Sequence, residues 1–496
     1  MSFRISKTAR ASAAIFALIA ILSVQAPSAS AQAGFPDRLR RYSDSNAVPF
    51  RIGTAVTLRG SPSLYPPNGY QPGLLSGDPK DRAYQTMVRS QFNQIEAGNE
   101  TKMMSLWTGG AARINGHYVA LTNLFDASGP LSQLCSWAGA QRPRLTVRGH
   151  CMVYFQNYTL PTFPSGQPPL FVRNAGGKQV LNTAYTPEDL RDMLRSYVQQ
   201  VVDATMAQNA AARSRYGQRV VTAWDVTNEI LQEDAPAVSP QLGFAYRGDD
   251  AWHSSGPSNV EGSPGYDYVS DIYRWAAQEM AADAGKTIGG HRVTAADGFL
   301  LYYNEYNLEW KASKMADALA LVRHIRATGG RVDGLGFQAH VEADGLNTTQ
   351  FEANVSAAIN AGLRFSLTEA DCAIQQKPGP GKPTTAQQQV NQGREYGEMA
   401  ALCLRHKQSC DLFQIWGATD DGSWLQNAQA TPMTRWIKDT RPGATKGQMG
   451  YWPKQGQFAP ETLYDPATQA LDPKSGQIVS TAYDQILAVL RIKSRK

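Results

Sequence analysis

Thr-Pro-Glu-Asp-Leu (residues 186–190) opens a helical pattern, and Val-Val-Thr-Ala-Trp-Asp-Val (residues 220–226) follows it as a strand pattern. This succession of helix and strand decides the fold. Thr186 is a candidate helix cap, Pro187 suits the first helical position, and Asp189 lies in the first turn. The strand is nearly all apolar, which is typical of a parallel strand covered on both faces. Apolar residues recur at helical spacing along the helix, at Leu190, Met193, Leu194, Tyr197, Val198 and Val201.

The same alternation of strand and helix patterns runs through the rest of the chain. It argues for βα units around a parallel sheet, and eight such strands close into a barrel more readily than they form an open sheet. We therefore predict an α/β fold, a single (β/α)8 TIM barrel over residues 40–492, with the loops 231–265 and 426–460 as insertions at its catalytic face. The predicted strands are Phe50–Val56, Phe92–Glu96, Leu145–Cys151, Val220–Val226, Phe299–Asn304, Val332–Gln338, Leu363–Thr368 and Leu412–Gly417.

The first 31 residues have the pattern of an export signal. Basic residues at positions 4, 7 and 10 precede an apolar stretch at 13–24, and Ala-Ser-Ala at 29–31 ends the segment. A membrane anchor is the alternative, but the apolar stretch is too short to span a bilayer. We expect residues 1–31 to be a signal peptide, and the protein to be secreted or periplasmic with no membrane contact after cleavage.

The remainder of the chain has an ordinary charge. Residues 1–31 contain three basic residues and no acidic one. Without them, the formal net charge falls from +6 to +3. No run of Lys and Arg is interleaved with aromatic residues, so a nucleic-acid partner has little support. Ten Trp and twenty-one Tyr suggest sugar-stacking surfaces, although ordinary core packing is the alternative for most of these rings. We expect a monomer.

Five cysteines are present, at Cys135, Cys151, Cys372, Cys403 and Cys410. Export permits disulfides. Cys403 and Cys410 close a short loop and are the best candidate pair, and the odd count leaves at least one thiol unpaired. No Cys/His spacing resembles a metal site, so we expect neither a metal nor a cofactor.

Polar clusters follow five of the predicted strands. The carboxyl ends of barrel strands face the active site, where a buried charge must be paired. Glu229 ends the fourth strand and Glu369 the seventh, so both can face the mouth of the barrel. One Glu alone is more simply a surface helix cap, but two at strand ends suit a glycosidase, in which one carboxyl group must be protonated when it meets the glycosidic oxygen. The clusters are residues 99–102, 148–150, 224–229, 338–340 and 368–371.

Residues 224–229, Trp-Asp-Val-Thr-Asn-Glu, resemble the acid/base signature of glycoside hydrolase family 10, the barrel xylanases. Residues 367–371, Leu-Thr-Glu-Ala-Asp, resemble the nucleophile strand of that family. Cys403 and Cys410 match a disulfide pair that often precedes its eighth strand. The resemblance implies a retaining endo-β-1,4-xylanase acting on xylan. Further similar segments follow in the family's order, at residues 50–55, 302–307, 415–420, 463–465 and 482–484.

The resemblance also implies roles for single residues. Glu369 would be the nucleophile, kept ionised by His340, which Asp371 would orient. Glu229 would be the general acid/base, and Asn228 would bond the sugar 2-hydroxyl. Core packing is the alternative role for the aromatic residues. The resemblance assigns to substrate binding Asn99, Lys102, His150, Gln338 and Tyr154, the walls Trp416 and Trp424, and Tyr306 beyond the cleaved bond.

Three positions depart from the family pattern. Gly98 stands where the family usually has a Glu, Tyr154 replaces a tryptophan, and Phe155 replaces a histidine. We expect these positions to border the sugars on the glycone side of the cleaved bond. Losing a carboxylate that bonds sugar hydroxyls removes interactions worth about 1.5–3 kcal/mol each, so the preference among xylans is open.

Two other functions remain as alternatives. A related barrel enzyme acting on another β-1,4-glycan would fit the altered third strand, and side-by-side assays on xylan and carboxymethylcellulose would separate the two. A non-catalytic glycan-binding barrel is the third reading. Loss of Glu229, Glu369 or His340 would favour it, and all three residues are present.

Overall fold

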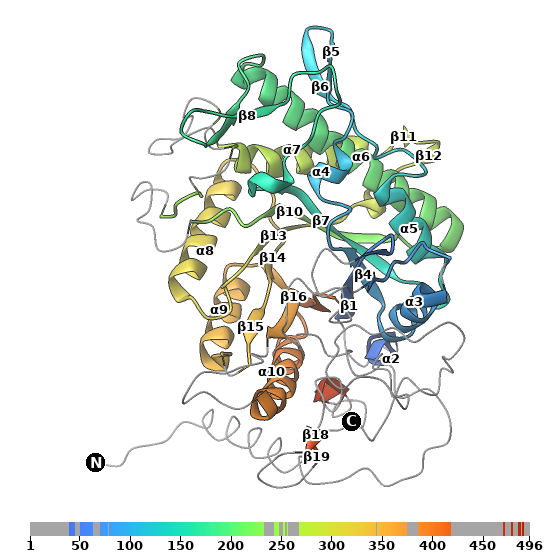
Figure 1. Ribbon diagram of the computed structural model, residues 1–496, viewed down its shortest axis with the longest axis vertical. Helices are drawn as coiled ribbons and strands as arrows, with labels where there is room; N and C mark the ends of the chain where they lie inside the picture. Colours follow the sequence, from blue (N-terminus) through green and yellow to red (C-terminus); the bar gives the residue numbers. More distant parts are fainter. Residues whose placement is uncertain are drawn as a thin grey trace. The chain divides into compact units, whose positions relative to one another are not determined.

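Eight parallel strands close into a barrel with helices around it (Figure 1). The computed structural model describes residues 39–44, 50–62, 70–77, 79–232, 243–247, 251–252, 255, 267–343, 345–373, 385–417, 470–471, 478–479, 485–487 and 489–490. Pairing of β1 with β17 closes the ring, which confirms the predicted fold. The barrel strands are β1 (Arg51–Val56), β4 (Gln94–Ala97), β7 (Thr146–Tyr154), β10 (Val221–Asn228), β13 (Leu300–Glu305), β14 (Gly334–Phe337), β16 (Arg364–Ala373) and β17 (Cys410–Ile415).

One long helix lies between each pair of successive barrel strands, as the βα pattern predicts. Short β-hairpins and helical turns decorate the loops, and β15 (His340–Glu342) pairs beside β16. The long helices are α3 (Pro79–Gln91), α5 (Pro130–Ala140), α6 (Pro187–Tyr216), α7 (Tyr268–Asp283), α8 (Ala312–Ala327), α9 (Thr348–Asn360) and α10 (Thr385–Arg405). The shorter elements are α2 (Leu39–Asp44), α4 (Met103–Leu106), and the pairs β2 (Ser61–Pro62) with β3 (Tyr70–Gln71), β5 (Ala111–Ile114) with β6 (His117–Ala120), β8 (Phe171–Arg173) with β9 (Gln179–Leu181), β11 (Thr287–Ile288) with β12 (His291–Arg292), and β18 (Ala470–Leu471) with β19 (Ile478–Val479).

Helix α6 begins and ends where its sequence predicts. The side chain of Thr186 accepts a hydrogen bond from the Asp189 amide, and the Asp189 carboxylate accepts one from the Thr186 amide, which completes a capping box. Pro187 occupies the first turn. Gly217 ends the helix with φ 80°, in the left-handed conformation that glycine adopts without steric cost. The predicted apolar stripe is buried against the barrel.

Close packing of side chains on the barrel strands depends on two glycines. Strands β7 and β10 pair with Gly149 opposite Trp224, and a Cβ at Gly149 would lie 2.1 Å from the Trp224 ring. A Cβ at Gly336 would lie 2.1 Å from Oδ1 of Asn304. Any larger residue at either position would therefore displace a neighbouring side chain.

The predicted disulfide is confirmed. Cys403 in α10 and Cys410 at the start of β17 are bonded, with their Cα atoms 5.4 Å apart. Cys135, Cys151 and Cys372 are buried outside this bond, and Cys372 donates a hydrogen bond to Glu395.

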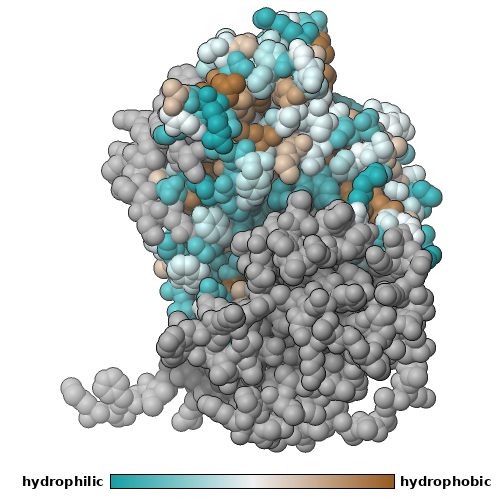
Figure 2. All heavy atoms as spheres, viewed as in Figure 1, coloured by the Kyte–Doolittle hydropathy of each residue, from teal (hydrophilic) through white to brown (hydrophobic). Residues whose placement is uncertain are grey.

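Apolar and polar residues are mixed on the described surface, and Figure 2 shows the apolar ones scattered in that view. Among the described helices, none combines the length and apolar character needed to cross a membrane. Several sequence-based expectations fall outside the described residues: the signal peptide at 1–31, Trp424, the loop 426–460 and most of the loop 231–265. The extent of a single domain over 40–492 therefore stays a prediction.

Candidate active site

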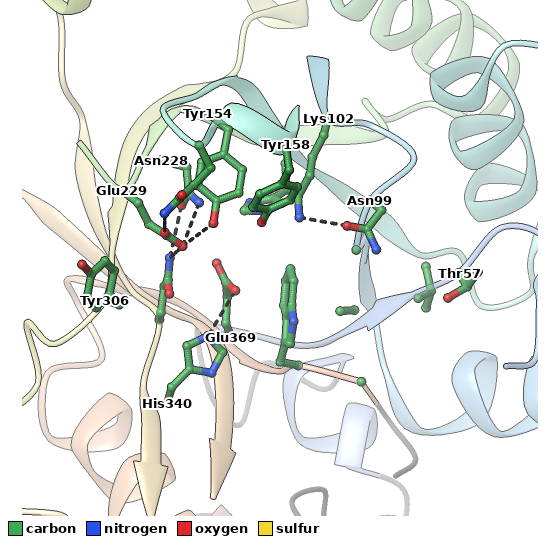
Figure 3. Close-up of a pocket in the computed structure, with 18 of the residues that line it drawn as sticks. Thr57, Asn99, Lys102, Tyr154, Tyr158, Asn228, Glu229, Tyr306, His340 and Glu369 are labelled. Atoms are coloured by element: carbon green, nitrogen blue, oxygen red, sulfur yellow. Dashed lines mark hydrogen bonds and ion pairs between the residues drawn. The ribbon is translucent and has the colours of Figure 1, made fainter. Parts of the chain in front are cut away.

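A cavity of about 640 Å³ opens at the carboxyl ends of the barrel strands. Its walls bring together nearly all the residues that the sequence singled out, and Glu229 and Glu369 lie between Tyr306 at one end and Asn99 at the other (Figure 3). Asp371 does not line the cavity but lies behind His340. The predicted site residues that line it are Asn99, Lys102, His150, Tyr154, Asn228, Glu229, Tyr306, Gln338, His340, Glu369 and Trp416.

Glu369 is held on both of its carboxylate oxygens. Nδ2 of Asn304 donates a hydrogen bond of 2.6 Å to Oε1 of Glu369. Nε2 of His340 lies 3.4 Å from Oε2, and Nδ1 of the same ring lies 2.9 Å from Oδ1 of Asp371. The His340 ring therefore bridges the two carboxylates, which is the arrangement that the resemblance implied.

Charge pairing fixes the protonation of Glu369 and His340. Burial alone would raise the pKa of Glu369, but the hydrogen bond from His340 and the charges of His150, His340 and Lys102 outweigh it and hold that pKa below its ordinary value. Burial would lower the pKa of His340, but Asp371 and Glu369 raise it well above 6.5. Glu369 is therefore a carboxylate facing an imidazolium, suited to act as a nucleophile rather than as an acid.

Glu229 lies directly after β10 in an uncommon backbone conformation. Its φ is 54°, a strained value for a residue with a side chain, and such strain persists only where the surroundings fix it. The amide of Glu229 donates to the carbonyl of Asn304 across 3.1 Å. This bond to the neighbouring strand holds the turn and directs the Glu229 side chain into the cavity.

Three neutral donors and one more distant cation surround the Glu229 carboxyl group. The Tyr154 hydroxyl donates to Oε1 across 2.6 Å, Nε2 of Gln338 donates to the same oxygen across 3.1 Å, and Nε2 of Gln156 donates to Oε2 across 3.1 Å. Nη1 of Arg247 lies 4.0 Å from Oε2. These donors stabilise the carboxylate that remains once Glu229 has given up a proton.

Asn304 connects the two glutamates. Its Nδ2 donates to Oδ1 of Asn228 across 2.8 Å as well as to Glu369. Its Oδ1 accepts a hydrogen bond of 2.7 Å from Thr368, which fixes the orientation of the amide. Asn228 is therefore held beside both catalytic candidates, and its own Nδ2 donates to Oε1 of Glu229 across 3.4 Å.

The end of the cavity near Asn99 combines hydrogen-bonding groups with an aromatic wall. Nζ of Lys102 donates to Oδ1 of Asn99 across 3.0 Å and lies 5.3 Å from the centre of the Tyr154 ring. The rings of His150 and Trp416 meet edge to face, 5.3 Å apart. Phe155 differs from its prediction: it directly follows β7, is 1% exposed in the apolar core and does not line the cavity, whereas its neighbour Tyr154, the last residue of β7, does.

A buried charge network supports this end from below. Arg148 forms an ion pair with Asp225, and Nδ1 of His150 lies 3.0 Å from Oδ2 of Asp225. Burial would raise the pKa of Asp225, but Arg148 and His150 lower it. Burial and the nearby Asp225 raise the pKa of Glu96 well above its ordinary value, so Glu96 carries the proton of the two acids. His150 is thereby fixed at the cavity wall.

The opposite end of the cavity carries Tyr306 on a charged support. Nζ of Lys314 lies 3.2 Å from the centre of the Tyr306 ring and 2.9 Å from Oε1 of the buried Glu305. Glu305 also accepts a hydrogen bond from the amide of Leu231, across 3.2 Å, two residues after Glu229. The same carboxylate thus ties the aromatic plate to the segment that follows the acid/base candidate.

Sequence reasoning missed several residues that line the cavity or bond its glutamates, among them Gln156, Tyr158, Arg247 and Asn304. Asn304 is the last residue of a predicted strand, and this position at the catalytic face was the one sequence signal that could have identified it as a site residue. Arg247 lies in a long loop without periodicity and reaches the site because its amide pairs with the carbonyl of Ile230. No local pattern could have signalled that contact.

Two groups of acidic and histidine side chains have the spacing of a metal site among the described residues. The first, Glu96 with His150 and Asp225, already contains the Arg148 guanidinium. In the second, on α6 and α7, Lys286 lies 3.0 Å from Asp283, and burial together with Asp283 raises the pKa of Asp203 to about 8. The Arg148 guanidinium neutralises the first group. The Lys286 ammonium and a proton retained by Asp203 neutralise the second. We therefore assign a metal to neither group.

The barrel and the two glutamates at the ends of its fourth and seventh strands define a glycoside hydrolase of the barrel class. More narrowly, the chain belongs to glycosyl hydrolase family 10, whose family model matches residues 71–442. This confirms the resemblance found in the sequence.

Similar proteins include named xylanases. Endo-beta-1,4-xylanase Xyn10C of Cellvibrio japonicus is 24% identical over 69% of this chain and 46% of its own length. Endo-1,4-beta-xylanase C of Paenibacillus barcinonensis is 26% identical over 71% of this chain and 27% of its own. The chain thus spans less than half the length of these relatives.

Solved structures share the fold. The native xylanase10C of Cellvibrio japonicus superposes with a TM-score of 0.54 at 22% identity, over 81% of this chain and 67% of that one. The family 10 structure from Paenibacillus barcinonensis gives a TM-score of 0.54 at 22% identity, over 81% of this chain and 93% of that one. At these identities the likeness establishes the barrel alone.

Proposed function

We propose that this chain is a retaining endo-1,4-β-xylanase that cleaves internal β-1,4-xylosidic bonds of xylan by double displacement. The contrast between the two glutamates carries the proposal. Glu369 faces the cation His340 across 3.4 Å, whereas Glu229 accepts hydrogen bonds from the neutral Tyr154 and Gln338, with Arg247 4.0 Å away. Two carboxyl groups in different environments are what acid/base and nucleophilic roles require. Membership of family 10 and the named xylanases among its relatives support the choice of substrate.

In the proposed mechanism Glu369 attacks the anomeric carbon while Glu229 protonates the departing glycosidic oxygen. The covalent glycosyl ester on Glu369 is then attacked by a water molecule that Glu229 deprotonates. His340 stabilises the Glu369 carboxylate before attack and again when the ester breaks. Tyr154 and Gln338 stabilise the Glu229 carboxylate between the two steps.

Substrate contacts follow from the ends of the cavity. We assign Asn99, Lys102 and His150 to the sugar on the glycone side, against the apolar wall of Trp416. Tyr306 would stack on the sugar beyond the cleaved bond. A sugar ring has apolar faces and a rim of hydroxyls, so aromatic plates and polar donors at alternate positions suit it. Asn228 would bond the 2-hydroxyl, and Trp424 is proposed as a further wall.

A polysaccharide panel with stereochemical readout tests this function. Purified protein would be assayed for reducing ends on xylan, carboxymethylcellulose and mixed-linkage glucan, and the first-formed anomer would be read by proton NMR. We expect shortening of xylan chains and initial β-anomeric products. Initial α-anomers would rule out the retaining mechanism, and inactivity on every polymer would favour a binding barrel.

A related β-1,4-glycanase acting on a glucan is the second candidate. The tyrosine at position 154 favours it, because it replaces a tryptophan of the family at a residue that lines the cavity. The same panel separates the two candidates through the ratio of rates on xylan and carboxymethylcellulose. A ratio below one would favour the glucan-cleaving enzyme over the xylanase.

We also propose that the protein is exported, to the periplasm or the medium, and acts as a monomer. The pattern of residues 1–31 motivates export, and the Cys403–Cys410 bond suits an oxidising compartment. Terminal sequencing of the purified protein should begin at Gln32. Light scattering should give the mass of one chain.

A further inference from the structure

Gly98, at the end of β4, has no backbone need to be glycine. Its φ lies outside the left-handed region, and an added Cβ would meet only the carbonyl oxygen of Val56, at 3.8 Å, among the described residues. A side chain therefore fits at this position without displacing its neighbours. Since Gly98 lines the cavity beside Asn99, the missing side chain leaves space inside the site.

The wall around this space is neutral. Val56 is the neighbour of Gly98 there, and the other cavity residues connected to Val56 and Thr57 on this side are Pro72 and Tyr84, whose hydroxyl is already hydrogen-bonded to the Thr57 backbone. Figure 3 shows Thr57 beyond Asn99, at the end of the cavity away from Tyr306. The space thus extends the site outward on the glycone side.

Charged side chains near Gly98 are committed elsewhere. The Glu100 carboxylate accepts hydrogen bonds from the amides of Leu58 and Asn99, so it does not replace the carboxylate that the family pattern has at position 98. Lys102 keeps its charge because its partner Asn99 is neutral, but its Nζ lies by the Tyr154 ring, on the side of Asn99 away from Thr57 (Figure 3). Arg247 lies beside Glu229 instead. Val56, Thr57, Pro72 and Tyr84 therefore offer no cation to an acidic substituent.

We propose that the space at Gly98 is a side pocket for a neutral, hydroxylated substituent on a glycone-side sugar. Such a group is either a pentosyl branch on xylan or the hydroxymethyl group of a hexose unit. The proposal rests on the proposed function, and it predicts that the enzyme accepts chains that a carboxylate at position 98 would exclude. Hydroxyls of the substituent can donate to the carbonyl oxygen of Val56, which has a second lone pair besides the one that accepts from the Gly98 amide.

Three variants separate this pocket from a mere loss of affinity. Gly98→Gln fills the space without charge, Gly98→Glu fills it with a carboxylate, and Gly77→Glu adds the same charge at an exposed glycine whose Cβ would meet nothing within 4 Å among described atoms. Calorimetry in a Glu369→Gln background would measure binding without turnover. The probes are linear xylotetraose, the same oligosaccharide with a glycone-side arabinofuranosyl branch, and cellotetraose.

We expect the starting protein to bind the branched probe or cellotetraose at least as tightly as linear xylotetraose. Gly98→Gln should weaken binding of that preferred probe by about tenfold and leave the affinity for the linear probe unchanged. Gly98→Glu should also increase the affinity for the linear probe by about tenfold to a hundredfold, since one charged hydrogen bond is worth about 1.5–3 kcal/mol. Loss of affinity for the branched probe identifies the pentosyl branch as the group in the pocket. Loss of affinity for cellotetraose identifies the hydroxymethyl group instead.

Equal effects of Gly98→Gln on all three probes would overturn the proposal, as would rejection of both substituted probes by the starting protein. Preferred binding of a uronosyl-branched oligosaccharide would overturn the neutral character of the pocket. Failure of the native enzyme to hydrolyse any polymer would refute the proposed function instead, and the calorimetry would still decide the role of Gly98.

Discussion

The hydroxyl of Tyr154 donates a hydrogen bond of 2.6 Å to Oε1 of Glu229, from the strand that neighbours β10. Burial and the charge of Glu229 raise the pKa of Tyr154, so the phenol keeps its proton and remains a donor. The sequence suggested substrate binding for Tyr154. Its contact with Glu229 adds a positioning role, because the bond fixes one oxygen of the acid/base candidate.

Replacing Tyr154 with Phe removes this hydrogen bond and keeps the ring. We expect kcat to fall about tenfold, since a hydrogen bond to a charged group is worth about 1.5–3 kcal/mol, while KM changes little. Steady-state kinetics over a range of pH would measure both constants, and Tyr154→Trp should restore part of kcat. A large rise in KM with kcat unchanged would show that Tyr154 serves substrate binding alone.

Much of the barrel follows from local sequence. Burial on both faces makes each parallel strand a short apolar run, as in Val220–Val226, and Thr186 with Asp189 marks a helix start through bonds only three residues apart. Glu229 and Glu369 could be paired in advance because closure of the ring brings the ends of distant strands together. The predicted site residues that are described all lie in or beside one cavity.

Contacts between distant side chains could not be predicted in this way. Asn304 bonds Asn228 and Glu369 from positions 76 and 65 residues away, and nothing around Asn304 records those distances. Arg247 reaches Glu229 from a long loop, and Phe155, directly after β7, is buried in the apolar core away from the cavity. Each of these three placements depends on how segments distant in the sequence are aligned in the folded chain, and neighbouring residues do not determine that alignment.

His340 should set the acid limit of activity. Because its charge and hydrogen bond hold the pKa of Glu369 below 4.5, the native enzyme should keep activity below that pH. His340→Asn removes the cation, so the pKa of Glu369 should rise by about 1–3 units, and the acid limb of kcat/KM should move to higher pH by the same amount. An unmoved limb, measured on the same substrate, would show that His340 does not control Glu369.

The same pair links stability to pH. The folded pKa of His340 lies above 6.5, so its stabilising contribution is complete below 6.5 and is lost as the pH rises through the folded value. The folded pKa of Glu369 lies below 4.5, so its contribution is complete above 4.5 and is lost as the pH falls through the folded value. In His340→Asn both contributions should shrink, and denaturant unfolding at several pH values would record the difference.

Arg148 should be a large contributor to stability. It is 1% exposed and pairs with Asp225 inside the barrel. Arg148→Met would leave the buried Asp225 paired with His150 but without its guanidinium partner, and breaking a buried ion pair costs about 3–5 kcal/mol. Arg195→Met, on the exposed face of α6, removes the same charge and should change unfolding by less than about 0.5 kcal/mol. Equal effects in urea denaturation would contradict the buried pairing.

The Cys403–Cys410 bond should stabilise the fold without serving catalysis. It closes a loop with a sequence separation of 7, for which chain entropy predicts about 2.5 kcal/mol. The double variant Cys403→Ser with Cys410→Ser should therefore lose about that much in guanidinium unfolding, yet keep its kcat, because the bond lies at the end of β17 away from Trp416. Reduction of the native enzyme should reproduce the loss. Unchanged stability on reduction would mean that the bond is absent in solution.

The roles of the two glutamates can be separated by chemical rescue. Glu369→Ala should form no glycosyl-enzyme and lose several orders of magnitude in activity on every substrate. Glu229→Ala should depend on the leaving group: aryl glycosides with good leaving groups need no proton, so a burst of phenol should precede slow turnover that lacks a base. Azide needs no deprotonation and attacks from the face that Glu229 vacates, so it should restore turnover and give a β-glycosyl azide. An α-azide from Glu229→Ala would reverse the two assignments, and wild-type activity in either variant would remove that residue from the mechanism.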